Sequence, residues 1–210
     1  MSTAVPAPPA ATEPVPGGSP PPRRPRKVFL LVGVIVAVAL GIGLFTSIGT
    51  GSKGSSGQPG PGDPVPAFRA QNVGPSGPAT VSVSAAGGRP TVLLFFGAWC
   101  TACQSELPPL AQAVQHQEAA RGSLSTIRVL GVDTLDGPST ARAFIHKEGV
   151  TFPVADDADA AITQSAFHFE GDPYTVFVNA DGTVAKVVAG AQLTPASFTA
   201  DERALIPSGR

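Results

Sequence analysis

Hydrophobic residues along this chain form one long run and several short ones. The long run, Val28–Ile48, holds 21 residues without a charge and follows Arg23, Arg24, Arg26 and Lys27. A helix of that length spans about 31 Å, which matches the hydrocarbon core of a bilayer. The run therefore predicts a transmembrane anchor. It is long for the apolar region of a cleaved signal peptide, and no small-residue cleavage site follows it.

The segments on either side of this run differ in composition. Residues 1–27 are rich in proline, carry four basic residues and one acid, and show no apolar periodicity, so they predict a disordered tail. Residues 49–64 contain six glycines and three prolines and predict a flexible tether. Because basic flanks remain on the cytoplasmic side, we expect the tail in the cytoplasm and residues 65–210 outside it.

Short apolar runs in residues 65–210 predict the strands of a sheet. Thr91–Phe96, Thr126–Val132 and Tyr174–Val178 are almost continuously hydrophobic, which is typical of strands buried on both faces. The Asn-Ala-Asp-Gly segment at 179–182 predicts a hairpin turn into a further strand, Thr183–Ala189, with Gly182 able to adopt a positive φ. A strand pair is expected before residue 91.

Helical patterns separate these strands. Apolar residues at helical spacing follow Cys103 and Pro138; they are Leu107, Leu110, Val114, Ala141, Phe144 and Ile145. Two more helices are expected over Asp157–Phe167 and, after Thr194-Pro195, over Ala196–Leu205. The order of elements predicts an α/β domain with a mixed central sheet flanked by helices on both faces.

The composition of the whole chain narrows the class of protein. With 24 glycines and 23 prolines in 210 residues it approaches a low-complexity chain, yet a mean hydropathy of +0.17 and 14% charged residues are too apolar for a disordered one. A net charge of −1 argues against a protein that binds nucleic acid. Two cysteines cannot build a disulfide-stapled scaffold or a four-cysteine zinc site.

These two cysteines carry the candidate chemistry. Cys100 and Cys103 follow the apolar run Thr91–Phe96 and open the next helix, where unpaired backbone N–H groups stabilise a thiolate. The spacing lets the pair alternate between dithiol and disulfide through a mixed disulfide with a substrate. We expect Cys100, at the helix tip, to be the nucleophile and Cys103 the resolving thiol. A static disulfide here would close only a tiny loop and stabilise the fold little.

The residues around the pair resemble a known family. Residues 95–108, FFGAWCTACQSELP, resemble the F-W-A-x-W-C-x-x-C-x-x-E-x-P block of membrane-anchored thioredoxin-like proteins of the TlpA/ResA/CcmG type. Residues 66–68 (PAF), 88–90 (GRP), 151–156 (TFPVAD) and 171–178 (GDPYTVFV) resemble further blocks of that family, in the same order. The resemblance implies a thioredoxin-like fold and thiol–disulfide oxidoreductase activity, with no cofactor besides the redox-active Cys100–Cys103 disulfide.

The resemblance also implies roles for neighbouring residues. Pro173 would be a cis-proline that turns the backbone of Asp172 toward Cys100, where an extended substrate segment pairs. Glu106 would be a partly buried acid that tunes the cysteines and carries a proton; its plainer role is a favourable charge near a helix N-terminus. Trp99 would shield the disulfide or cover the edge of the sheet.

Two positions depart from the family. Thr101-Ala102 stands between the cysteines where many members have a proline, and Asp172 stands where an apolar or hydroxyl residue is expected. A carboxylate facing Cys100 raises the pKa of its thiol, which predicts a comparatively reducing pair. Alternatively, Asp172 selects protein substrates with basic or amide-rich segments.

The sequence therefore predicts a membrane-tethered disulfide reductase outside the cytoplasm. Its partners would be protein thiols or disulfides and, by resemblance, a membrane thiol-transfer protein, with cytochrome c maturation as one setting. An oxidase or isomerase of secreted proteins is the alternative within the same chemistry. A copper-binding assembly factor of this fold would use C-x-x-x-C and a distant histidine, for which His168 is the one candidate, and a non-catalytic partner-binding domain is a third alternative.

Overall fold

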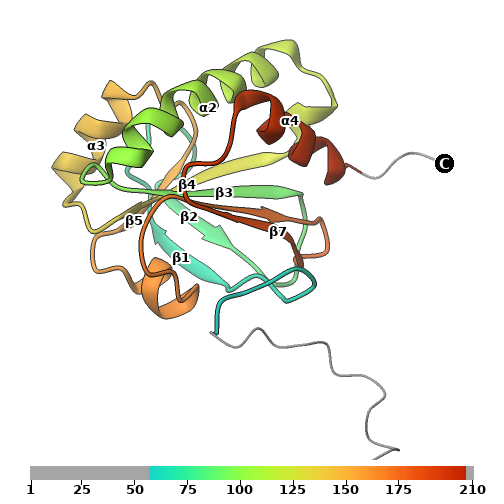
Figure 1. Ribbon diagram of the computed structural model, residues 1–210, viewed down its shortest axis with the longest axis horizontal. Coiled ribbons are helices and arrows are strands. Elements are labelled where there is room, and N and C mark those ends of the chain that lie inside the picture. The colour runs from blue at the N-terminus through green and yellow to red at the C-terminus, as the bar shows by residue number, and fades with distance from the viewer. Residues whose placement is uncertain (1–56, 207–210) are drawn as a thin grey trace, which may run out of the picture. The chain divides into compact units, whose positions relative to one another are not determined.

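Five strands build the central sheet of the domain (Figure 1). The computed structural model describes residues 57–206, in which the strands lie in the order β5-β4-β3-β6-β7. β3, β4 and β5 are parallel, whereas β6 is antiparallel to β3 and β7 is antiparallel to β6, so the sheet is mixed as predicted. The strands are β3 (Thr91–Phe96), β4 (Arg128–Thr134), β5 (Val154–Asp157), β6 (Tyr174–Val178) and β7 (Val184–Ala189).

Strand β3 occupies the middle of this sheet and is buried over its whole length. Its Leu93 pairs with Leu130 of β4 on one side and with Val176 of β6 on the other. The continuous hydrophobicity of the strand follows from this position, because side chains on both faces of a central strand meet the core. The predictions for β3 and β6 are confirmed residue for residue.

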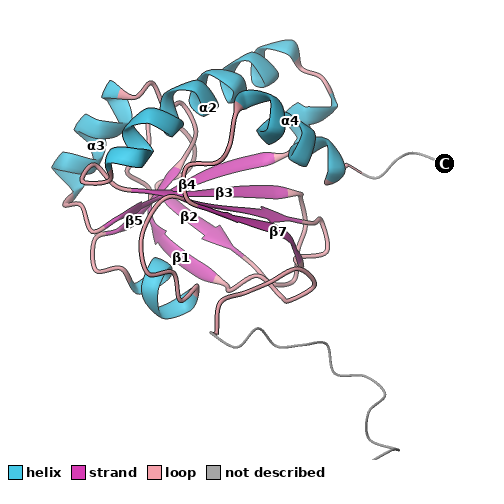
Figure 2. Cartoon of the chain, viewed as in Figure 1, coloured by secondary structure: helices cyan, strands magenta, loops and turns pink. Residues whose placement is uncertain are grey.

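The two faces of the sheet are covered differently (Figure 2). Helices α2 (Thr101–Ala120), α3 (Pro138–Lys147) and α4 (Pro195–Ala204) all pack on the face of Val92, Leu94 and Phe96. The face of Leu93 and Phe95 is covered by the antiparallel pair β1 (Phe68–Gln71) and β2 (Thr80–Val83) and by a short π-helical segment, η2 (Ala161–Ala166). Helical segments therefore lie on both faces as expected, but the second face has only the short η2, since the early strand pair takes the rest of it.

Two predicted elements differ in extent. The helix expected over Asp157–Phe167 is reduced to η2, because Ala160 has a left-handed φ of 56° and Asp157 bonds the N–H groups of Ile162 and Thr163. The strand expected over Thr126–Val132 begins and ends two residues later, since residues 123–126 form a 3₁₀ turn, η1. The strand thereby includes the polar residues Asp133 and Thr134.

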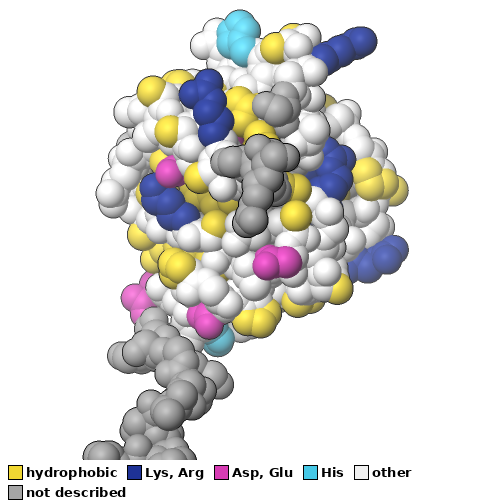
Figure 3. Space-filling view, turned by 90° about the vertical axis from the view of Figure 1, so that its right-hand side faces the viewer, with side chains coloured by type: hydrophobic (Ala, Val, Ile, Leu, Met, Phe, Trp, Pro, Cys, Tyr) yellow, Lys and Arg dark blue, Asp and Glu magenta, His cyan; other side chains and the backbone are white. Residues whose placement is uncertain are grey.

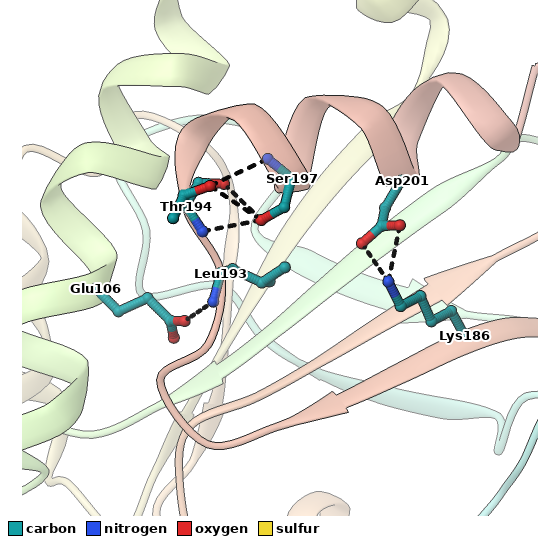
Figure 4. A network of polar contacts seen from close by, with 6 residues as sticks. All are labelled: Glu106, Lys186, Leu193, Thr194, Ser197 and Asp201. Atoms are coloured by element: carbon teal, nitrogen blue, oxygen red, sulfur yellow. Dashed lines mark hydrogen bonds and ion pairs between the residues drawn. The ribbon is translucent and has the colours of Figure 1, made fainter.

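The hairpin and the last helix form as their sequences predict. Gly182 has a φ of +86° in the turn between β6 and β7, and a Cβ there would lie 2.4 Å from the carbonyl oxygen of Ala85. α4 opens with a capping box, in which Thr194 accepts from the N–H of Ser197 and the Ser197 hydroxyl accepts from the N–H of Thr194 (Figure 4). Lys186 of β7 also forms an ion pair of 2.7 Å with Asp201 of α4.

The domain begins before residue 65. Gly62 donates to the carbonyl of Val184, and Val184 donates to the carbonyl of Asp63, so this end of the expected tether pairs with the start of β7. The expected tail, the expected anchor at 28–48 and the start of the tether lie outside the described residues. Within residues 57–206, the helices are too short or too polar to span a membrane.

Candidate active site

The cysteine pair lies at the N-terminus of α2. Cys100 is the N-cap residue, with an extended backbone, and its Sγ accepts a hydrogen bond of 3.1 Å from the N–H of Cys103. Sγ atoms of the two residues are joined in a disulfide, and both side chains are buried, with 5% and 1% of their surface exposed. Because the first N–H groups of a helix lack partners within it, a sulfur at this position receives both an amide hydrogen and the positive end of the helix dipole.

The loop before β6 brings Asp172 and Pro173 to this pair. Their peptide bond is cis, which confirms the expectation for Pro173. The carbonyl oxygen of Asp172 lies 3.4 Å from Cys100 Sγ. The contact follows from the sheet, because Tyr174 at the start of β6 pairs with Phe95 near the end of β3, and both chain segments leave the sheet at the same edge.

Residues 97–99 connect β3 to α2 and are held by the end of β4. The indole N–H of Trp99 donates to the carbonyl of Thr134 at 2.8 Å, while 49% of the Trp99 surface is exposed beside Cys100. The N–H of Ala98 donates to Asp136 Oδ2 at 2.5 Å, and the carbonyl of Ala98 accepts from the Gln104 side chain of α2 at 2.9 Å. The exposed indole can therefore cover an approaching substrate while the peptide below it is fixed from two sides.

Glu106 lies on the buried side of α2 (Figure 4). Its Oε1 accepts a hydrogen bond of 2.8 Å from the N–H of Leu193, in the loop between β7 and α4. Burial raises the pKa of the Glu106 carboxyl, and hydrogen bonds from the backbone N–H groups of Leu193 and Gln192 partly oppose that rise. A carboxyl with a raised pKa holds its proton to a higher pH than an exposed glutamate does, which is the direction that proton transfer requires.

A small cavity brings three of the predicted residues together. Cys103, Glu106 and Pro173 line it, with room for about one water molecule. A proton could pass between Cys103 and Glu106 through such a water. The plainer role of Glu106, a favourable charge near the N-terminus of α2, is an alternative for this side chain, which has 8% of its surface exposed.

The carboxyl of Asp172 is shielded and has no hydrogen-bond partner among the described residues. Burial raises the pKa of Asp172 to about 6; the nearby Thr134 hydroxyl opposes that rise, and the charges of Asp157 and Asp136 add to it. No hydrogen bond forms between the Thr134 and Asp172 side chains, because Thr163 donates its hydroxyl hydrogen to Asp157 and Thr134 donates to Thr163. At neutral pH Asp172, whose backbone carbonyl contacts Cys100, therefore carries a negative charge without a donor among the described residues.

Two further acidic residues at the site were missed in the sequence. Asp133 and Asp136 follow the apolar part of β4, a place where acids usually mark a solvated loop, yet 1% and 7% of their surfaces are exposed. Burial, followed by the charge and hydrogen-bonding proximity of Asp136, raises the pKa of Asp133 to about 8, with smaller contributions from Asp156 and Asp172. Their position after a strand parallel to β3 was the available signal, because such strands end at one edge of a sheet.

Charge is divided between the two ends of the parallel strands. Arg89 precedes β3 and Arg128 opens β4, whereas Asp133, Asp156 and Asp157 lie at the carboxyl ends of β4 and β5. On the face shown in Figure 3, on the side where α4 ends, Lys and Arg side chains surround hydrophobic ones. The cysteine pair thus lies at the acidic end.

The described residues offer no metal centre. Among residues 57–206, no three or more His, Cys, Asp or Glu side chains are grouped so that they could hold a metal ion. His168 lies between η2 and β6, and its carbonyl accepts from the side chain of Gln58.

Comparison with known proteins agrees with this geometry. Residues 61–187 match the family model described as the AhpC/TSA family. The chain belongs to the AhpC/TSA family. It is a thioredoxin-like thiol–disulfide oxidoreductase, with Cys100–Cys103 as its redox-active pair.

Several members and structural neighbours of this thioredoxin-like group are similar to the chain. The thiol–disulfide oxidoreductase ResA of Bacillus subtilis is 25% identical over 170 residues, which cover 80% of this chain and 88% of ResA. The soluble secreted antigen MPT53 of Mycobacterium tuberculosis is 30% identical over 96 residues, 46% of this chain and 51% of MPT53. The structure of DsbF from MTB has a TM-score of 0.54 and 25% identity, covering 66% of this chain and 95% of DsbF.

Proposed function

We propose that this protein is a membrane-tethered disulfide reductase that works outside the cytoplasm. Cys100 is the nucleophile, Cys103 the resolving thiol and Glu106 the proton carrier. Trp99, Asp172 and Pro173 shape the surface on which the substrate lies. The anchor and its orientation rest on the sequence of residues 1–48, and the description of MPT53 as a secreted antigen supports a setting outside the cytoplasm.

The exchange proceeds in two balanced steps. The Cys100 thiolate attacks one sulfur of a substrate disulfide, which forms a mixed disulfide and releases the other substrate sulfur as a thiolate. Cys103 then gives its proton to Glu106, and its thiolate attacks Cys100 Sγ, which releases the second substrate sulfur. Two electrons have passed to the substrate, and the Cys100–Cys103 disulfide remains. A membrane thiol-transfer partner then reduces that disulfide.

One observation carries the assignment of direction. The backbone of Asp172 lies 3.4 Å from Cys100 Sγ, and its shielded carboxyl has no donor among the described residues. A negative charge at this place destabilises the Cys100 thiolate, and so the reduced form of the pair, which gives up its electrons more readily. The same backbone is the edge on which an extended segment of a protein substrate would pair.

The midpoint potential of the Cys100–Cys103 couple tests the direction. Equilibration with glutathione should give a potential near that of thioredoxin, about −270 mV, and a value near about −120 mV would make the protein an oxidase. Asp172→Asn should raise the potential, because a neutral side chain no longer disfavours the thiolate. Glu170→Gln, at an exposed position two residues earlier, is the matched control and should leave it unchanged.

Oxidation of secreted proteins is distinguished by the redox state of the Cys100–Cys103 pair in cells. A reductase should be trapped mostly as the dithiol, whereas an oxidase should be trapped mostly as the disulfide. The dithiol form should also reduce insulin, and Cys100→Ala should abolish that activity. Insulin reduction that survives the loss of Cys100 would refute its role as nucleophile.

A further inference from the structure

The end of β4 carries a buried carboxyl pair that the exchange steps do not use. Asp133 has 1% of its surface exposed, and neither of its oxygens receives a hydrogen bond from a donor among the described residues. The carboxyl of Asp136, three residues further along the chain and also buried, acts on it by charge and as a hydrogen-bonding group. Two carboxylates only repel each other, whereas a carboxylic acid donates a hydrogen bond to a carboxylate. The contact is therefore favourable when the pair holds one proton.

Asp136 connects this pair to the cysteines. Its Oδ2 accepts from the N–H of Ala98, two residues before Cys100, at 2.5 Å. Ala98 is fixed on its other side by Gln104 of α2, and the neighbouring Trp99 is fixed by the carbonyl of Thr134. The segment that presents Cys100 is thus attached to β4 through Asp136 and through the residue next to Asp133.

We propose that Asp133 is a positioning residue for Cys100, which as a neutral acid donates to Asp136 and so fixes Ala98 and the loop that ends at the cysteine. Asp133 touches no reacting atom. It acts through Asp136 and the Ala98 peptide. This inference rests on the thiol-exchange role of Cys100 proposed above.

The charges around Asp133 determine when this arrangement holds. The groups that face it are Asp136 in the following loop, Asp156 of β5 and Asp172 before β6, and all three are acidic. Each of them favours the neutral form of Asp133, as does burial. When the proton leaves at alkaline pH, a second buried negative charge appears next to Asp136, and the hydrogen bond between the two carboxyls is lost.

The chain contains a reporter for the loop. Trp99 is the only tryptophan of the 210 residues, and its indole bonds to the residue after Asp133. Its fluorescence in the disulfide form of the full chain, in detergent, should change with pH in a transition near pH 8, where Asp133 loses its proton. The disulfide form is used because its cysteines do not titrate.

Two substitutions at position 133 test whether the hydrogen-bond donor of this side chain positions the loop. Asp133→Asn keeps a donor toward Asp136 and should abolish the pH transition, with fluorescence fixed at its neutral-pH value. Asp133→Ala removes the donor and should give the alkaline fluorescence at every pH. In exchange with a small disulfide, Asn should retain the rate within about threefold and Ala should lose at least about tenfold, the scale of a misplaced reacting group.

Asp156→Asn is the matched control, because it removes a charge that acts on Asp133 and leaves Asp133 and Asp136 unchanged. It should keep the transition and move its midpoint to lower pH. A transition that persists in Asp133→Asn, or equal loss of exchange in the Asn and Ala variants, would overturn the inference. If Cys100 itself forms no mixed disulfide, the proposed function fails, whereas normal exchange with an unaltered pH profile removes only the role of Asp133.

Discussion

Glu202 provides a quantitative test of how α4 holds the helix that carries the cysteines. The side chain is 0% exposed, and its Oε2 accepts a hydrogen bond of 2.7 Å from Gln117 of α2. Its Oε1 has no partner among the described residues. Burial raises the pKa of Glu202 from 4.5 to about 7, although the hydrogen bond from Gln117 and the charge of Arg203 oppose the rise.

The sign of the effect on stability follows from proton binding. Because the folded protein holds this proton more tightly than the unfolded chain, the free energy of unfolding falls as pH rises from the ordinary glutamate pKa toward 7 and is level above it. A shift of that size corresponds to about 3 kcal/mol, at 1.36 kcal/mol for each pKa unit. Glu202→Gln keeps an acceptor for Gln117 and carries no charge. Its stability relative to the unmodified protein should therefore increase by about 3 kcal/mol between about pH 4.5 and about pH 8.

Urea unfolding followed by far-ultraviolet circular dichroism measures this difference. Both proteins are kept in the disulfide form, so that Asp133 and Asp172 contribute equally to each and cancel in the comparison. Glu118→Gln, at an exposed position of α2, is the control and should give a profile parallel to that of the unmodified protein. A stability difference for Glu202→Gln that stays constant across this pH range would refute the assignment of a buried, uncompensated charge to Glu202.

Two further predictions concern the site and the hairpin. Glu106→Gln preserves the acceptor for the Leu193 N–H but removes the titratable proton, so resolution of the mixed disulfide by Cys103 should slow by at least about tenfold in stopped-flow measurements. An unchanged rate would remove Glu106 from the mechanism. Gly182 has a φ of +86°, and Gly182→Ala places a methyl group 2.4 Å from a backbone oxygen. The substitution should lower the free energy of unfolding by at least about 1 kcal/mol. Gly122→Ala, at an exposed position with open space around it, is the control and should not lower it.

The sheet could be predicted from sequence because its signals are local. A strand buried on both faces is apolar at nearly every position, and Val92–Phe96 satisfies that requirement without reference to any other segment. Gly182 and the capping residues Thr194 and Ser197 are local signals of the same kind, since each fits a backbone conformation or an unpaired N–H within a few residues.

The side of the sheet on which each element packs is not a local property. α2, α3 and α4 share a face because the β1–β2 pair and η2 occupy the other, and the sequence of one helix contains no information about that competition. The end of η2 illustrates a second limit. Asp157, at the start of the expected helix, does bond two N–H groups, but Ala160 in a left-handed conformation limits the helical segment to residues 161–166.

The acidic side of the site was the least predictable part for a physical reason. An aspartate after an apolar strand normally marks the return to solvent, and only the tertiary structure shows that Asp133 and Asp136 are buried. Cys100, Cys103 and Pro173 were identified because their chemistry depends on spacing and on a resemblance that spans the chain. The link from Asp133 to the cysteine loop passes through a backbone group, the N–H of Ala98, which donates to Asp136. A backbone contact of this kind cannot be recognised from the identity of the residue.

Two electrostatic effects of opposite sign act on the Cys100 thiolate, and only one of them depends on pH. The N-terminus of α2, through the N–H of Cys103, favours the Cys100 thiolate at every pH. The carboxyls of Asp172 and Asp133 oppose it only when ionised, with pKa values of about 6 and about 8. The electrostatic environment therefore stabilises the thiolate least in alkaline solution, where both carboxyls are charged. The pair should become more reducing with rising pH than the release of its own thiol protons explains, and Asp172→Asn should remove the part of that excess that develops near pH 6.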